Sequence, residues 1–263
     1  MKRLVILGGG ESGVGAALLG KVKKYNVFLS DSGKIANKYK DVLIHNEIEW
    51  EEGGHTESEI LTADLVIKSP GIPDHVSIVQ KLQSATIPVV SEIEFAALFT
   101  TANIIGITGS NGKTTTTMMV YHILRQSGFD VAMGGNIGES FAEQVLTNTA
   151  HYVLELSSFQ LDGIQDFRPH IAVITNITPD HLDRYDYNFE NYITSKFRIV
   201  MNQTSDDYLL YDSDDEVITS YINSHPIQST LVPFSLSKIV ENGTYLEQNN
   251  IIIEFNNRDI TVS

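Results

Sequence analysis

The chain has 263 residues, no cysteine and a formal net charge of −15. Its length allows two compact domains with hydrophobic cores, while the lack of cysteine excludes disulfides and thiolate metal sites. The acidic balance argues against a nucleic-acid or anionic-membrane partner, which would need clustered Lys and Arg. No apolar run approaches the roughly 18 residues of a membrane span, and Met1 leads directly into a strand. We therefore expect a cytoplasmic protein without a signal peptide.

The first strand, residues 2–7, leads into a glycine-rich turn. This turn, Gly8-Gly9-Gly10-Glu11-Ser12-Gly13-Val14-Gly15, opens a predicted helix and contains the pattern G-x-G-x-x-G. A second strand, residues 26–29, ends at Asp31, about twenty residues after the glycines, as in a Rossmann-type nucleotide site. NAD binding with Asp31 on a ribose is the first functional interpretation. A tight strand-to-helix turn with a solvated Asp is the structural alternative.

The rest of this first part alternates between strands and helices. Residues 64–68 form a strand that ends in the turn Ser69-Pro70-Gly71-Ile72-Pro73. The following predicted elements are a helix over 74–84 with Asp74 near its cap, a strand over 87–90 and a helix over 91–99. In the last helix, Ser91 would be the N-cap and Glu94 would occupy the capping-box position. The alternation predicts a parallel sheet whose ligand edge gathers the glycine turn, Asp31 and the turn at Ser69.

A change of composition near residues 100–103 is the candidate boundary between a domain over 1–100 and a domain over 101–263. The strand over 103–108 enters the loop Gly109-Ser110-Asn111-Gly112-Lys113-Thr114-Thr115-Thr116, and a helical pattern follows. Strand, glycine-rich turn and helix form the context in which backbone N–H groups and a Lys bind phosphate, and in which the next hydroxyl ligates Mg²⁺. The loop is a variant, because the usual first glycine is replaced by Ile107. The predicted ligand is a nucleoside triphosphate.

Polar side chains follow the next strands, predicted over 131–133, 151–156 and 171–175. Glu155 ends an apolar strand at the sheet edge that also carries the phosphate loop, so it could hold Mg²⁺ together with Thr114. His181 has no partner in a zinc-binding pattern, and a lone His is more often structural or exposed. Lys196, on a helix predicted over 191–201, would ordinarily be a solvated charge.

The last part is β-rich. A strand over 206–211 precedes the acidic run Asp212-Ser213-Asp214-Asp215-Glu216, which is most simply a solvated face and only weakly suggests calcium. Short β segments are predicted over 243–246, 251–255 and 260–262, separated by Asn-rich turns.

Five segments together resemble the Mur ligases of peptidoglycan synthesis, most closely the members that add D-glutamate. These segments are Gly106-Ile-Thr-Gly-Ser-Asn-Gly-Lys-Thr-Thr115, Gly134-Gly-Asn-Ile-Gly138, Glu155-Leu-Ser-Ser-Phe-Gln-Leu161, Asn176-Ile-Thr-Pro-Asp-His-Leu-Asp-Arg-Tyr185 and Ser195-Lys-Phe-Arg198. The family's phosphate loop also lacks the first glycine. The resemblance implies an α/β fold with a Rossmann-like UDP-binding domain, then a P-loop ATPase-type central domain with a mostly parallel sheet and a small β-rich segment.

The resemblance also implies roles for individual residues. ATP would be bound by Gly109, Ser110, Asn111, Gly112, Lys113, Thr114 and Thr115, and Mg²⁺ by Thr114, Glu155, His181 and a carbamylated Lys196. Lys113, His181 and Lys196 would be catalytic. The UDP-linked substrate would contact Gly10, Glu11, Ser12, Asp31, Ser69, Gly71, Asn136, Ser157 and His181.

The implied activity joins D-glutamate to UDP-N-acetylmuramoyl-L-alanine, using ATP and an acyl-phosphate intermediate, in a monomer. Two metal ions and Lys113 would offset the repulsion between the reacting anions. Family members continue with an adenine-holding segment and a further Rossmann-like domain that supplies much of the D-glutamate site. We therefore expect this chain not to complete ligation by itself.

Two alternatives stay open. One is a ligase of the same superfamily with another acceptor, such as the L-alanine, diaminopimelate or folylpolyglutamate adders. The run Ser157-Ser158-Phe159-Gln160 and the Rossmann-like first domain favour D-glutamate. The other is an NAD-binding dehydrogenase or binding module, which leaves the phosphate loop unexplained.

Overall fold

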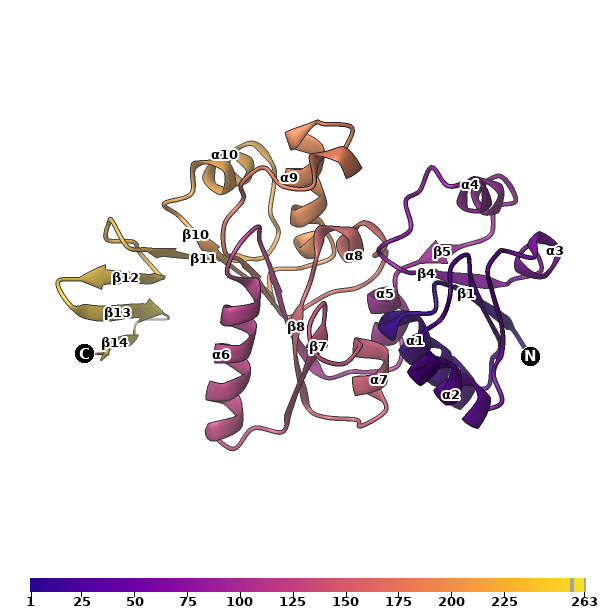
Figure 1. Ribbon diagram of the computed structural model, residues 1–263. Coiled ribbons are helices and arrows are strands. Elements are labelled where there is room, and N and C mark those ends of the chain that lie inside the picture. The colour runs from indigo at the N-terminus through magenta and orange to yellow at the C-terminus, as the bar shows by residue number, and fades with distance from the viewer. Residues whose placement is uncertain (256–257, 263) are drawn as a thin grey trace.

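The computed structural model describes residues 1–255 and 258–262 and contains two parallel-sheet units that follow one another along the chain (Figure 1). The first unit has a five-stranded sheet in the order β3-β2-β1-β4-β5, with every neighbouring pair parallel. Its elements are β1 (Arg3–Leu7), α1 (Glu11–Val22), β2 (Asn26–Asp31), α2 (Asn37–His45), β3 (Glu49–Glu52), α3 (Glu57–Ile60), β4 (Leu65–Lys68), α4 (Ser77–Ser84), β5 (Val89–Val90) and α5 (Glu92–Ala97).

The second unit has a nine-stranded sheet in the order β14-β13-β12-β11-β10-β9-β6-β8-β7. It is parallel from β12 to β7, whereas β12, β13 and β14 pair antiparallel and project at the end of the sheet (Figure 1). Its elements are β6 (Asn103–Thr108), α6 (Lys113–Gln126), β7 (Val131–Gly135), α7 (Phe141–Val145), β8 (His151–Glu155), α8 (Ser158–Asp162), β9 (Ile171–Ile174), η1 (Leu182–Arg184), α9 (Phe189–Phe197), η2 (Arg198–Val200), β10 (Tyr208–Asp212), α10 (Glu216–Ser224), β11 (Thr230–Ser235), β12 (Thr244–Glu247), β13 (Asn250–Phe255) and β14 (Arg258–Val262). The predicted α/β fold with a mostly parallel sheet and a β-rich end is confirmed.

The sequence of strand β1 does not alternate between apolar and polar residues, because both faces of the strand are buried. Leu4 and Ile6 lie in a large core that includes α1, while Val5 and Leu7 face a smaller core that includes α4. Helices cover both faces of this parallel sheet, so the four buried positions Leu4 to Leu7 are all apolar. The larger core continues through α5 and α7 to β8, and it therefore joins the two units.

Several elements of the structure were not predicted. Helices α2 and α3 and strand β3 lie in the charged stretch between residues 35 and 63, and α7 follows β7. Strand β3, Glu-Trp-Glu-Glu, is an edge strand without the apolar run of a buried strand. The start of α4 was also predicted wrongly: Val76 is its N-cap, whereas Asp74 forms an ion pair with Lys68 at 3.0 Å.

Helix α5 attaches the first unit to the second through polar side chains. Ser91 is its N-cap, as predicted, and its hydroxyl accepts a hydrogen bond from the backbone N–H of Glu94 at 3.2 Å. The side chain of Glu94, however, does not complete the capping box. Its carboxylate accepts the backbone N–H groups of Gln165, Asp166 and Phe167, at 2.8, 3.0 and 2.9 Å. These three bonds compensate the cost of burying the carboxylate and fix α5 against the loop that follows α8.

Glu92 lies beside this anchor, in the interface between α5 and α7. Its side chain is buried; one oxygen accepts the backbone N–H of Ala142, and the other has no hydrogen-bond partner among the residues that the structure describes. Burial raises the pKa of Glu92 to about 8, and the nearby charge of Glu11 adds to this rise. The carboxyl group is therefore protonated in the folded protein at neutral pH.

A Glu92→Gln variant should remove a pH dependence of stability. Between the ordinary carboxyl pKa and about 8, the folded chain holds a proton that the unfolded chain has released, so stability falls as pH rises through this window. Gln is neutral throughout this range. The variant should therefore not show the loss of unfolding free energy, on the order of 4 kcal/mol, that we expect for wild type between about pH 5 and pH 9. Urea unfolding across this range, with Glu190→Gln as the exposed control, measures the difference. If the plots of unfolding free energy against pH ran parallel for wild type and Glu92→Gln, the prediction would be contradicted.

Candidate active site

The phosphate loop between β6 and α6 requires glycine at two positions. Gly109 has φ +148°, and a Cβ there would lie 2.0 Å from Oγ1 of Thr175, so no larger residue fits. Gly112 has φ +80°, in the left-handed region, and forms the N-cap of α6. These glycines allow the chain to turn directly from strand to helix close to the end of β9.

Bonds to the segment after β9 hold the loop in shape. The backbone N–H of Ser110 donates to the carbonyl of Asn176 at 2.9 Å, and the Ser110 hydroxyl donates to the carbonyl of Thr178 at 2.9 Å. The backbone N–H of Asn111 donates to Oδ1 of Asn176, also at 2.9 Å. Lys113 begins α6, and its Nζ lies 3.0 Å from the carbonyl oxygen of Ser110. The ammonium group therefore lies against the loop that would cradle a phosphate.

Glu155, at the carboxyl end of β8, lies beside the first turn of α6. The side chain is buried, and its two oxygens accept the Thr114 hydroxyl and the Asn136 amide, each at 2.7 Å. The backbone of Gly135, with φ +101°, passes so close that a Cβ would lie 2.3 Å from the Glu155 carbonyl oxygen. The structure thus brings Thr114 and Glu155, which were both predicted to bind Mg²⁺, together with Asn136, which was predicted to bind the substrate.

The donors at this point suit Mg²⁺. A hydroxyl and a carboxylate oxygen 2.7 Å apart, at the start of a helix that follows a phosphate loop, are hard oxygen ligands of the kind that Mg²⁺ shares with phosphate. Within residues 1–255 and 258–262, no group of three or more His, Asp or Glu side chains is arranged to hold a metal ion. Thr114 and Glu155 would supply two ligands, and Mg²⁺ commonly takes its other ligands from phosphate and water.

Lys196 of α9 is buried, with 1% of its surface exposed, so the interpretation as a solvated charge was wrong. Its Nζ donates to the carbonyl of Gly109 at 2.7 Å and lies 4.6 Å from the ring centroid of Tyr192. Burial lowers the pKa of Lys196 to about 7, and the charge of Lys113 lowers it further, while Asp180 and a second Asp act in the opposite direction. A large fraction of this amine is therefore neutral at physiological pH.

His181 directly precedes η1 in the segment after β9. It has φ +50°, its side chain is 57% exposed, and its Nε2 lies 3.5 Å from a carboxylate oxygen of Asp180. Its ring centroid lies 5.3 Å from that of Phe159. Ser157 is the N-cap of α8 and forms a complete capping box with Gln160, which orders the helix that carries Phe159.

In the first unit, Asp31 and Ser69, two of the residues predicted to bind the substrate, lie at the carboxyl edge of the sheet. The two carboxylate oxygens of Asp31 accept the backbone N–H groups of Gly9 and Gly33, at 2.6 and 2.7 Å. Asp31 thereby connects the glycine turn to the loop after β2. A ribose hydroxyl that bound Asp31 would have to share the carboxylate oxygens with these two N–H groups. Ser69 packs over Gly8, where a Cβ would lie 2.3 Å from the Ser69 hydroxyl oxygen.

The other predicted substrate residues of the first unit lie at the start of α1 and in the loop after β4. Gly10 is the N-cap of α1, and Glu11 and Ser12 form its first turn. Burial raises the pKa of Glu143 in α7, and the charges of Glu139 and Glu11 add to this rise. Gly71 is exposed at the tip of the loop after β4, and its carbonyl accepts a hydrogen bond from Arg184 at 3.4 Å.

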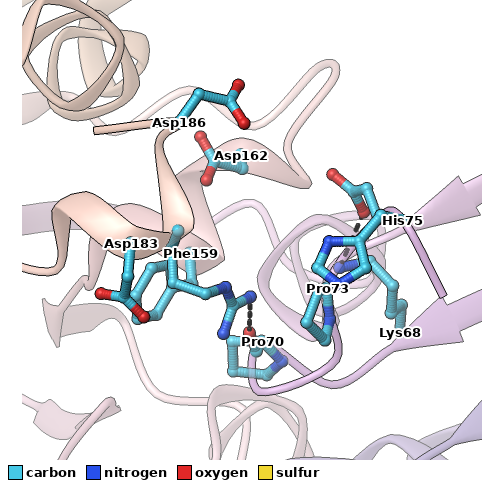
Figure 2. Close-up of a pocket in the computed structure, with 10 residues that line it drawn as sticks. Lys68, Pro70, Pro73, His75, Phe159, Asp162, Asp183 and Asp186 are labelled. Atoms are coloured by element: carbon cyan, nitrogen blue, oxygen red, sulfur yellow. Dashed lines mark hydrogen bonds and ion pairs between the residues drawn. The ribbon is translucent and has the colours of Figure 1, made fainter. Parts of the chain in front are cut away.

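A pocket of about 300 Å³ lies between the loop after β4 and the segments at α8 and η1 (Figure 2). Figure 2 shows Phe159 and Asp183 on one side of it and Pro73, His75 and Lys68 on the other. Sequence reasoning assigned no role to Phe159, Asp162 or Arg184, which line this pocket. For Phe159 and Arg184 the only signal was their position in segments that resemble a family, and Asp162 had none, because no pattern shows which loops face one another.

The fold and site define a nucleotide-binding enzyme of the P-loop class, with a second α/β unit across a cleft. Residues 107–262 match the family described as Mur ligase middle domain, and residues 3–78 match the family described as MurD N-terminal domain. The chain belongs to the Mur ligase family, whose members are ATP-dependent ligases that form amide bonds.

Relatives with high sequence identity carry the name of one member of this family. The chain is 58% identical over 262 residues to the UDP-N-acetylmuramoylalanine–D-glutamate ligase of Christiangramia forsetii, covering 99% of this chain and 59% of the relative. It is 51% identical over 254 residues to the protein of the same name from Bacteroides fragilis, covering 96% of this chain and 57% of the relative. The chain thus spans less than two thirds of the length of these relatives.

Solved structures agree on the fold. UDP-N-acetylmuramate:L-alanyl-γ-D-glutamyl-meso-diaminopimelate ligase from Neisseria meningitides has a TM-score of 0.67 at 17% identity, covering 98% of this chain and 86% of that one. A murein peptide ligase from Psychrobacter arcticus has a TM-score of 0.64 at 18% identity, and the match covers 100% of this chain and 61% of that one. Separately, none of the helices in the described ranges is both long and apolar enough to cross a membrane.

Proposed function

We propose that the chain forms the UDP-substrate-binding and ATP-binding parts of a ligase that joins D-glutamate to UDP-N-acetylmuramoyl-L-alanine. The observation that carries the proposal is the contact of Thr114 and Asn136 with the buried carboxylate of Glu155 beside the phosphate loop. This arrangement supports the use of a Mg²⁺-bound nucleotide, and the names of the relatives supply the substrates. In this proposal residues 1–100 form the UDP-substrate domain and residues 101–263 the ATP-binding domain of a cytoplasmic monomer.

The phosphate loop would bind ATP through its backbone N–H groups, with Lys113 against the phosphates and Thr115 in the first turn of α6. Thr114 and Glu155 would hold Mg²⁺, which supplies positive charge where the phosphates and the attacking carboxylate meet. In a chain with a net charge of −15, such local cations are needed to bring the two anions together. Asn136, Ser157 and His181 would contact the muramoyl-alanine end of the substrate.

The proposed reaction has two steps. The terminal carboxylate of UDP-N-acetylmuramoyl-L-alanine attacks the γ-phosphorus of ATP, ADP leaves and an acyl phosphate forms. The amine of D-glutamate then attacks the acyl carbon, loses a proton and expels phosphate, which leaves an amide bond. In the first step Lys113 stabilises the charge that develops on the transferred phosphoryl group.

Lys196 would become an anionic ligand for a second Mg²⁺, near His181, by reaction with CO₂. The neutral amine forms a bond to the carbon, releases a proton and becomes a carbamate, so the lowered pKa favours the reaction. We expect intact-mass measurement under carbamate-retaining conditions to show one added CO₂, with greater occupancy at about pH 8 than at about pH 6. Lys196→Met should lose the adduct. An adduct that persists in this variant would place the modification elsewhere, and the absence of any adduct at the higher pH would refute the role.

A binding panel tests the proposed function. Calorimetry should show tighter binding of UDP-N-acetylmuramoyl-L-alanine than of UDP-N-acetylmuramate or UDP, and a nonhydrolysable ATP analogue should bind in a Mg²⁺-dependent way. Preference for the form without L-alanine would instead indicate a ligase with another acceptor. Tight binding of NADH without competition by UDP would support a dehydrogenase or an NAD-binding module.

A further inference from the structure

The loop after β4, Ser69-Pro70-Gly71-Ile72-Pro73, is held firmly at both ends. At its start, the backbone N–H of Ser69 donates to the carbonyl of Leu7 at 2.9 Å. At its end, Nζ of Lys68 donates to the carbonyl of Ile72 at 2.7 Å. The exposed tip between these points is bound differently, because its two carbonyl groups accept hydrogen bonds from the other unit.

These bonds come from Arg184, the last residue of η1. Its Nη2 donates to the carbonyl of Pro70 at 3.2 Å, the bond dashed at Pro70 in Figure 2, and its Nη1 donates to the carbonyl of Gly71 at 3.4 Å. The guanidinium carbon also lies 4.4 Å from the ring centroid of Phe159. A planar fork that stacks on an aromatic ring while donating to two neighbouring carbonyls is a geometry that Arg provides and Lys cannot.

The position of Arg184 joins two halves of one binding site. The loop at Ser69 belongs to the group proposed to bind the UDP part of the substrate, whereas Phe159 lies two residues after the Ser157 cap of α8, beside His181. One extended substrate would contact both halves. Its binding costs less free energy when the two halves are already held at the right separation.

We propose that Arg184 is a positioning residue that holds the tip of the loop after β4 against α8, and so presets the cleft for the UDP-linked substrate. This inference rests on the proposed function. Pocket-lining Lys68 cannot take this role, because its ammonium group is already bound to Ile72 and to Asp74, at 2.7 and 3.0 Å. Arg184 thus couples the units at the cleft, while Glu94 couples them through the loop that follows α8.

Two variants separate the parts of this role. Arg184→Met keeps an apolar chain over Phe159 but removes the N–H donors, and Arg184→Lys keeps the charge but not the fork. Calorimetry should show that both bind UDP-N-acetylmuramoyl-L-alanine about tenfold more weakly than wild type, with unchanged affinity for a nonhydrolysable ATP analogue. Arg125→Met, on the exposed end of α6, is the charge-matched control. Unchanged substrate affinity, equal losses for both ligands or full affinity in Arg184→Lys would each overturn the proposal.

Hydrogen exchange tests the contact without any ligand. The amides of Gly71 and Ile72 should exchange faster in Arg184→Met than in wild type, while those of β4 should not change. If wild type fails to bind the UDP-linked substrate, the proposed function fails, yet faster exchange would still support the contact. Unchanged exchange in Arg184→Met overturns the positioning role, whatever the wild type binds.

Discussion

Lys113→Met should bind a nonhydrolysable ATP analogue about 100-fold more weakly than wild type, because a charged hydrogen bond to phosphate contributes about 1.5–3 kcal/mol. Nζ of Lys113 already lies 3.0 Å from the carbonyl of Ser110, so the cation is positioned on the loop before nucleotide binds. The overall charge of −15 offers phosphate little other attraction. Calorimetry with the analogue and Mg²⁺ gives the measurement.

The matched control is Lys2→Met, which removes the same charge from an exposed position outside the site. Thermal unfolding should be nearly unchanged in both variants, since the methylene chain remains at residue 113. An affinity for the analogue within about threefold of wild type in Lys113→Met would rule out a direct phosphate contact.

Glu155→Gln should remove most of the dependence of nucleotide binding on Mg²⁺. The substitution preserves the size of a buried side chain but replaces one acceptor oxygen by an amide donor, opposite the Thr114 hydroxyl or the Asn136 amide. The variant loses a charged oxygen ligand, and we expect the tightening of analogue binding by Mg²⁺ to shrink by about tenfold or more. Calorimetry with and without Mg²⁺ measures this directly.

Glu155→Ala separates this effect from stability. It leaves the Thr114 hydroxyl and the Asn136 amide without their partner, which should lower the free energy of unfolding by about 2–3 kcal/mol. Glu139→Gln, on an exposed side chain in the loop after β7, is the control. Wild-type Mg²⁺ dependence in a well-folded Glu155→Gln variant would exclude Glu155 as a metal ligand.

The sequence predicted the elements whose local pattern is strong. Buried strands such as β6 and β8 have apolar runs, and the loop from Gly109 has the glycines that a sharp turn at a phosphate requires. Prediction from the sequence failed in stretches where charged residues interrupt the apolar pattern. Strand β3 and helix α2 lie in a polar stretch, and Asp74 resembled a helix cap but pairs with Lys68 because the loop before α4 continues to Val76.

By itself, the sequence determined the α/β fold, the phosphate loop and the family, because strand periodicity, turn glycines and ordered segments are local properties of the chain. Only the tertiary structure decided what surrounds each charge. Lys196 looked like a solvated side chain and is buried on the Gly109 carbonyl; Glu94 looked like a capping-box residue and binds three N–H groups of the other unit. Arg184 meets its carbonyl partners across more than a hundred residues. Such contacts depend on how two units pack, and packing brings together residues whose separation along the chain carries no signal.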